Sequence, residues 1–146
     1  MPARAKKSAK SAKKSKGATK SNKRVFVNRP DRRLELPFSD AVWAGDTLYL
    51  AGHIGLDPAT GRPPAETAGE IRIMLDSFKA TLAAAGLEMR HLVYIQIFCS
   101  DISLFAEFNT IYRTYFEKPF PTRAFIGSGP LLFGAKFEIQ GIAARD

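Results

Sequence analysis

Two stretches of the chain place apolar residues at every third or fourth position, which is the spacing of an amphipathic helix. The first stretch predicts a helix over 66–85, and Gly86 follows it as a residue that readily ends a helix in the left-handed conformation. The second predicts a helix over 103–117, which Asp101 or Ser103 can cap and two following prolines end. The apolar positions are Ile71, Met74, Leu75, Phe78 and Leu82 in the first stretch and Leu104, Phe105, Phe108, Ile111, Tyr112, Tyr115 and Phe116 in the second.

Other apolar runs are too short for helices and are rich in β-branched and aromatic residues, so they predict strands. Two of them flank Gly45-Asp46, a pair typical of a two-residue β-hairpin turn. The run nearest the C-terminus alternates, with Phe137 and Ile139 on one face and Glu138 on the other. The predicted strands are 41–44, 47–51, 91–100, 123–126 and 135–143.

This order of elements, β-β-α-β-α-β-β, predicts an α+β fold in which both helices cover one face of a mixed sheet. The opposite face of the sheet also needs a cover. Since the roughly 110 residues of the domain offer no third helix, another subunit is the natural cover. The pattern therefore predicts a homo-oligomer.

The charge of the chain is concentrated at its N-terminus. Residues 1–24 hold ten Lys or Arg and no acid, whereas the remaining 12 basic and 14 acidic residues give the rest of the chain a charge of −2. Without large apolar side chains, 1–24 is expected to be a disordered tail. Residues 25–33 are expected to be a linker or a short edge strand, and the domain spans 34–146. The tail is either a solvated extension or a segment that contacts nucleic acid non-specifically.

Several classes of protein and site are excluded by composition. The single cysteine, Cys99, lies in an apolar run and is interpreted as a buried thiol, so no intrachain disulfide is expected. No apolar run is long enough to span a membrane, and the N-terminus lacks the apolar middle region of a secretory signal, so we expect a cytoplasmic protein. His53 and His91 have no Cys or acid spacing that indicates a metal site.

From about Leu34 to the end, the chain resembles the RidA/YjgF family in the order and spacing of six segments. They are PFSDAV (37–42), LAGHIGLDPATG (50–61), LAAAGL (82–87), FAEFN (105–109), FPTR (120–123) and FEIQGIA (137–143). The resemblance implies a chorismate-mutase-like α+β fold, a homotrimer with clefts between adjacent subunits, and no cofactor. It also implies a 2-iminobutanoate/2-iminopropanoate deaminase, which hydrolyses reactive enamines and imines to 2-keto acids and ammonia.

The same resemblance implies roles for individual residues. Arg123 takes the place of the carboxylate-binding arginine, and a planar two-pronged guanidinium suits a carboxylate. Glu138 takes the place of the glutamate associated with the attacking water, whose proton it could accept. Gly52 brings its backbone close to the ligand, and Asn109 follows on the second helix. We expect Arg123 and Glu138 to be catalytic.

Four positions depart from the family pattern but stay among the expected substrate contacts. Phe38 stands where many members have Tyr, and Ala51 where Ser is common. His53 replaces a frequent Gln, and Phe125 replaces a small residue. These changes predict a more apolar and tighter pocket. Two alternatives therefore stay open. The first is a non-catalytic trimer that binds carboxylates. The second is an RNA-associated protein that uses the basic tail, since some members of the family are described as endoribonucleases.

Overall fold

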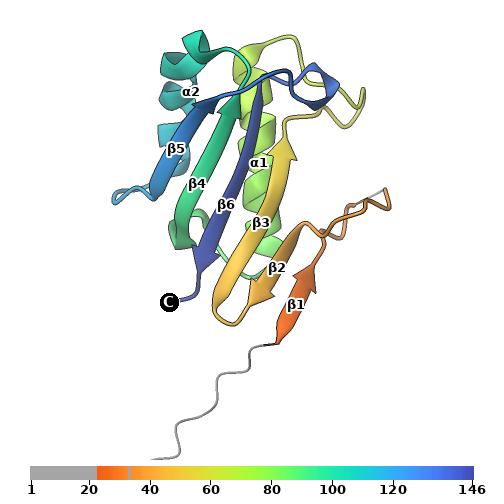
Figure 1. Cartoon of the computed structure of the whole chain (residues 1–146), viewed down its shortest axis with the longest axis vertical. Coiled ribbons are helices and arrows are strands. Elements are labelled where there is room, and N and C mark those ends of the chain that lie inside the picture. The colour runs from red at the N-terminus through yellow and green to blue at the C-terminus, as the bar shows by residue number, and fades with distance from the viewer. Residues whose placement is uncertain (1–22, 33) are drawn as a thin grey trace, which may run out of the picture.

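A computed structural model describes residues 23–32 and 34–146, so the expectation of a disordered tail falls on residues outside the described part of the chain, Lys23 and Arg24 excepted. The described part forms one six-stranded sheet and two α-helices (Figure 1). The elements are β1 (Arg24–Val27), β2 (Ala41–Ala44), β3 (Thr47–Ile54), α1 (Thr67–Ala84), β4 (Leu92–Cys99), α2 (Phe105–Tyr112), β5 (Thr122–Gly127) and β6 (Phe137–Ala144).

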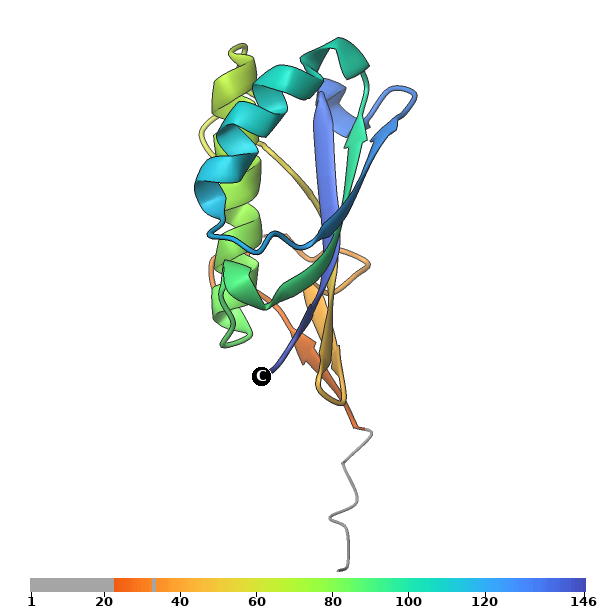
Figure 2. The same ribbon diagram turned by 90° about the vertical axis from the view of Figure 1, so that its left-hand side faces the viewer.

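The sheet is mixed, with the order β1-β2-β3-β6-β4-β5. Only β4 and β5 pair in parallel, and every other neighbouring pair is antiparallel. Figure 2 shows both helices on the same side of the sheet. The predicted fold class, the hairpin at Gly45-Asp46 and the two helices on one face are therefore confirmed.

The segment expected to be a linker or a short edge strand contributes an edge strand to the sheet. Residues 24–27, three of which fall in the segment 25–33, form the edge strand β1, which pairs antiparallel with β2. Val27 packs against the core, and Arg29 donates to the Ser77 side chain on α1 at 2.7 Å. Backbone pairing and this contact with a helix make 24–32 part of the folded unit.

Residue conformations explain where the helices end. Gly86 has a φ of 78°, and Leu87 N donates to Leu82 O at 2.9 Å, which closes α1 as predicted. Asp101 accepts a hydrogen bond from Ser103 N at 3.0 Å and caps the turn before α2. The expected helix over 103–117 is shorter, because α2 covers 105–112 and short 3₁₀ turns flank it at 102–104 and 113–115.

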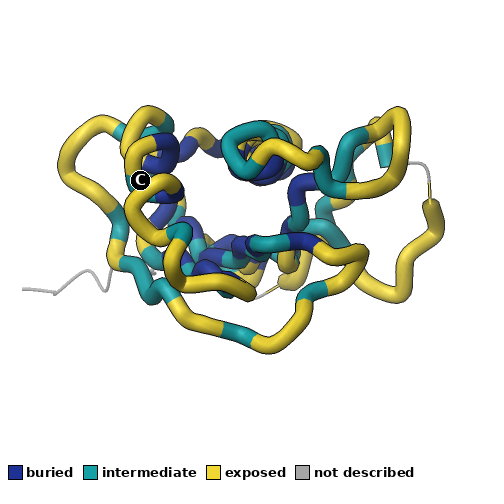
Figure 3. Tube along the Cα trace, turned by 90° about the horizontal axis from the view of Figure 1, so that it is seen from above, coloured by how far each residue is buried: buried dark blue, intermediate teal, exposed yellow. Residues whose placement is uncertain are grey.

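The core lies between the helices and one face of the sheet, where Figure 3 shows the buried positions gathered. Strand residues such as Leu48, Ile97 and Ile139 meet helix residues such as Phe78 and Leu82 there, all essentially without exposure. We call the other side the open face, because no described element covers it.

Polar and half-exposed side chains line the open face. Gln140 Nε2 donates to Gln96 Oε1 at 2.9 Å across β6 and β4, and Tyr49 is 51 % exposed on β3. Burial along β6 alternates strictly, with Phe137 and Ile139 in the core, as predicted. The expectation of a second subunit over this face stays a prediction.

Three further expectations concern absences or single residues. Cys99 is buried, its Sγ donates to Asp101 O at 3.0 Å, and burial raises the pKa of its thiol, so its interpretation as an inert core residue is confirmed. Among the described residues, no helix is long and apolar enough to cross a membrane. Within 23–32 and 34–146, no group of three or more His, Cys, Asp or Glu could hold a metal ion.

Candidate functional site

Arg123 lies on the helix side of the sheet, against α2. It pairs with the buried Ile95 across the parallel strands β5 and β4, so both side chains point to the same face. The Arg123 guanidinium carbon is 4.6 Å from the centre of the Tyr112 ring. Phe105, Phe108 and Phe125 also lie within 6 Å of it. The aromatic faces stabilise the cation by about 1 kcal/mol each or less and fix its direction.

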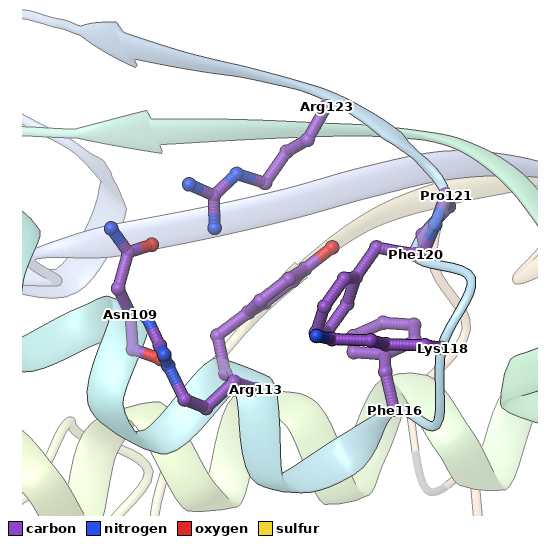
Figure 4. Close-up of a pocket in the computed structure, with 8 residues that line it drawn as sticks. Asn109, Arg113, Phe116, Lys118, Phe120, Pro121 and Arg123 are labelled. Carbon is purple, nitrogen blue, oxygen red and sulfur yellow. The ribbon is translucent and has the colours of Figure 1, made fainter.

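A cavity of about 600 Å³ opens beside Arg123, between α2, the segment that follows it and β5 (Figure 4). We call it the α2–β5 cavity. It brings Asn109 and Arg123 together. No acidic side chain lines it, and none among the described residues lies within ion-pair distance of Arg123. The lining consists of Asn109, Tyr112, Arg113, Phe116, Lys118, Phe120, Pro121 and Arg123.

Tyr112 lines this cavity and carries a buried hydroxyl. The residue is 5 % exposed, and its hydroxyl has no hydrogen-bond partner among the described residues. Burial raises the pKa of Tyr112 to about 12, although the nearby Arg123 opposes the shift. The hydroxyl is therefore neutral and keeps its proton as a hydrogen-bond donor. A buried polar group without a partner costs free energy, which a ligand would recover.

The sequence analysis did not identify Arg113, Lys118 or Tyr112 as site residues. Tyr112 and Arg113 follow Asn109 by three and four residues, and this spacing puts them on the same side of a helix. That signal was present in the sequence. Lys118 carries no such signal, since it lies in the irregular segment between α2 and β5.

Gly52 and Glu138 form a second group, on the open face. A Cβ placed on Gly52 would lie 2.1 Å from Glu138 Oε1, so the carboxylate occupies the space that a side chain would need. Burial raises the pKa of Glu138, so the carboxyl holds its proton to a higher pH than an exposed glutamate does. A carboxylate with a raised pKa is better matched to accept a proton from water near neutral pH.

A β-bulge in β3 produces this arrangement. Leu50 pairs with Gly141 and His53 with Ile139, so three steps along β3 match two along β6. The extra residue turns His53 to the core side and leaves Gly52 against Glu138 on the open face.

The expected role of His53 as a substrate contact is wrong for its side chain, because the ring is 9 % exposed beneath α1. Its Nδ1 lies 2.7 Å from Ala51 O and its Nε2 2.8 Å from Thr81 Oγ1. The carbonyl can only accept, so Nδ1 carries the proton and Nε2 accepts from the hydroxyl. Desolvation lowers the pKa of His53, and the ring also meets Phe78 edge-on at 5.2 Å.

Phe38, Ala51 and Phe125 occupy three different environments. The Phe125 ring packs edge-on against Phe105 and Phe108 and lies 5.6 Å from the Arg123 guanidinium carbon, so it helps to hold Arg123. Phe125 does not line the α2–β5 cavity, although it was expected to make the pocket tighter. Phe38 is 51 % exposed, with the Arg32 guanidinium over its ring. Ala51 is half-buried at the bulge in β3, next to Gly52.

A single chain does not bring Arg123 and Glu138 together. Glu138 pairs with Phe98 on β4 and faces away from the helices, whereas Arg123 faces them. The two residues are two strands apart in the sheet and three positions apart along β4, about 10 Å in each direction. Arg123 and Glu138 therefore lie on opposite faces of the sheet.

Glu70 holds the start of β6, next to Glu138, from within the core. No pattern in the sequence indicates this role. It is fully buried on α1, and its Oε1 accepts hydrogen bonds from Lys136 N at 2.6 Å and Phe137 N at 3.2 Å. Lys136 Nζ lies 3.5 Å from the other oxygen. Glu70 thereby fixes the start of β6, immediately before Glu138.

Comparisons with known proteins agree with this fold. Residues 30–145 match the family model described as Endoribonuclease L-PSP. The chain is 34% identical over 110 residues to the 2-iminobutanoate/2-iminopropanoate deaminase of Bos taurus, covering 75% of this chain and 80% of that protein.

Two solved structures from Escherichia coli are similar over most of the chain. The YjgF gene product has a TM-score of 0.70 at 34% identity and covers 75% of this chain and 89% of its own. TdcF with bound serine has a TM-score of 0.75 at 28% identity and covers 84% of this chain and 98% of its own. The mixed sheet with its two helices, the family-model match and these relatives together establish that the chain belongs to the RidA/YjgF family.

Proposed function

We propose that this protein hydrolyses small 2-imino acids to 2-keto acids and ammonia. One observation carries the proposal: Arg123 is held by aromatic rings in a cavity without an acidic side chain, which is an environment for a carboxylate. The Bos taurus relative is named for this activity, and TdcF holds serine, whose carboxylate offers the same group. The reaction would take place in the cytoplasm and needs no cofactor.

In the proposed reaction, the imine is protonated on its nitrogen. Arg123 binds the substrate carboxylate and so orients the imine carbon toward a water molecule. The water oxygen forms a bond to that carbon while Glu138 accepts one of its protons. The resulting carbinolamine takes up a proton on its nitrogen, and its C–N bond breaks to release ammonia. The hydroxyl proton passes to the ammonia, which leaves the 2-keto acid and ammonium. No electrons are transferred to or from the substrate, and positioning supplies most of the acceleration.

The separation of Arg123 from Glu138 requires a second copy of the chain. In the proposed homotrimer, the α2–β5 side of one copy lies against the open face of the next, so that Arg123 and Asn109 meet the partner's Glu138 and Gly52. Phe38 and Ala51 would then contribute apolar surface near the same cleft. This arrangement also covers the face of the sheet that no described element covers.

Mixing two inactive variants tests the function and the shared site together. Arg123→Ala and Glu138→Gln are each expected to hydrolyse 2-iminobutanoate slowly. When equal amounts are refolded or co-expressed together, about one site in four should receive Arg123 from one copy and Glu138 from another. Recovery of roughly a quarter of wild-type turnover supports the proposal. No recovery from mixed trimers would contradict a shared site, and an inactive wild type would contradict the reaction.

A non-catalytic carboxylate binder of the same fold is a second candidate. It is favoured because one chain supplies the whole lining of the α2–β5 cavity, Arg123 included. Phe38 and Ala51 also favour it, since they lack the hydroxyls of many relatives. Binding of 2-oxobutanoate that depends on Arg123, without turnover of any imine, would select it.

Contact with RNA is a third candidate and rests on the sequence of the tail. Ten basic residues and no acid in 1–24 favour weak, salt-sensitive binding to any polyanion. Because β1 begins at Arg24, the test is removal of residues 1–22 only. RNA binding should be lost and deamination kept, and RNA cleavage by the shortened chain would contradict this assignment to the tail.

A further inference from the structure

The α2–β5 cavity carries more positive charge than one carboxylate requires. Arg123, Arg113 and Lys118 all line it, and no acid does. In Figure 4, Arg123 reaches in from β5, whereas Arg113 and Lys118 come from the end of α2 and the segment after it. The cations therefore lie on two sides of the same space.

Both additional cations are free to bind a ligand. Arg113 Nε donates to Asn109 O at 3.2 Å, which holds the side chain along α2. Among the described residues, its two terminal nitrogens and Lys118 Nζ make no hydrogen bond or ion pair. Like charges that share a cavity repel one another, so an anion between them would relieve that repulsion as well as bind.

The Tyr112 hydroxyl is an independent sign of a ligand. It is buried, it belongs to a residue that lines the same cavity, and it has no hydrogen-bond partner in the described part of the chain. The cavity is also large for a four-carbon imino acid, since about 600 Å³ lies within the range of pockets that hold drug-sized molecules. Space, an unpartnered donor and two cations therefore remain once Arg123 has bound one carboxylate.

We infer that the preferred substrates are imines of dicarboxylic amino acids, with Arg113, Lys118 and the Tyr112 hydroxyl binding the second carboxylate. This inference rests on the proposed function and names its substrate class. For the five-carbon case, 2-iminopentanedioate protonated on its imine nitrogen and water give 2-oxopentanedioate and ammonium. The bonds that form and break are those of the proposed reaction, because the second carboxylate takes no part in it.

The test compares two imines with the same number of carbons. 2-Iminopentanedioate and 2-iminopentanoate are generated by oxidation of glutamate and norvaline, and they differ in the second carboxylate. Wild type should prefer the dianion about tenfold or more in kcat/KM, the scale of one charge-assisted contact. In the double variant Arg113→Gln/Lys118→Gln that ratio should fall close to one.

A matched variant controls for loss of charge alone. Arg62→Gln/Lys79→Gln removes two exposed cations that do not line the cavity and should keep the wild-type ratio. A wild-type ratio near one, or an equal fall in both double variants, would overturn the inference and leave the proposed function standing.

If neither imine is hydrolysed, the proposed function fails, and binding decides the inference separately. Titration with 2-oxopentanedioate and 2-oxopentanoate should then show a preference for the dianion that the Arg113→Gln/Lys118→Gln variant loses. Equal binding of the two keto acids would overturn it.

Discussion

The α2–β5 cavity and the open face around Gly52 and Glu138 differ in how complete each is within one chain. The cavity has walls, cations and a fixed guanidinium, whereas the open face offers one carboxylate against a glycine on an uncovered sheet. The first can select an anion without help. The second has no group of its own that would hold a substrate, so its chemistry depends on what association brings to it.

Replacing Arg123 should give the largest effect, because it removes the side chain that we propose binds the substrate carboxylate. Arg123→Ala is expected to lower kcat/KM for 2-iminobutanoate about 1000-fold, and Arg123→Lys by about 50-fold, since lysine keeps the charge without the two-pronged geometry. Arg62→Ala serves as the control. Full activity of Arg123→Lys would show that two-pronged binding is not used.

Gly52→Ala should damage the open face and spare the cavity. The new methyl would displace the Glu138 carboxylate, which is the flexible end of a side chain, so folding should be little affected. We expect turnover to fall about 30-fold, while affinity for 2-oxobutanoate falls much less. Gly129→Ala is the matched control, because nothing lies within 4 Å of its added Cβ. If the two variants had equal effects, Glu138 would have no part in the reaction.

The pH dependence of kcat/KM should report Glu138. Burial raises its pKa, so the proton-accepting carboxylate forms at a higher pH than in an exposed glutamate. Activity should therefore fall on acidification by up to about tenfold per pH unit, with a midpoint above the usual range of a glutamate. The residual activity of Glu138→Gln should lack this acidic limb of the pH profile, the fall in kcat/KM on acidification. The same limb in Glu138→Gln would assign it to another group.

The smallest effect concerns His53, on the core side of the same bulge. Desolvation lowers its pKa, so the unfolded chain takes up a proton at a pH where the folded chain does not. Stability should fall as the pH drops below the unfolded value and stop falling below the folded one. His53→Gln should show a smaller loss of Tm between pH 7.5 and 5.5. An identical loss would mean that His53 is not buried in its neutral form.

The sequence predicts most of the fold because the relevant signals are local. Apolar spacing, the Gly45-Asp46 turn and Gly86 each act within a few residues, and all three agree with the structure. β1 was left undecided because four residues with one packed side chain become a strand only through pairing with β2. Such pairing is not visible in the segment itself.

The site is less predictable because it depends on which face each residue occupies. Arg123, Asn109, Gly52 and Glu138 entered through the family resemblance, and spacing alone could not have grouped them. The separation of Arg123 from Glu138 follows from strand order and register, which no local pattern encodes. Lys118 was missed for a similar reason, since the fold of 113–121 alone brings it to the cavity.

The one-residue bulge in β3 acts as a selector between two surfaces. With uninterrupted alternation from the buried Leu50, Gly52 would face the core and His53 would face outward. An imidazole would then stand where the Glu138 carboxylate now lies against a hydrogen atom. The bulge thus decides whether Gly52 or His53 is presented on the open face. The number of residues in β3 therefore decides the chemistry of the open face as much as the identity of those residues does.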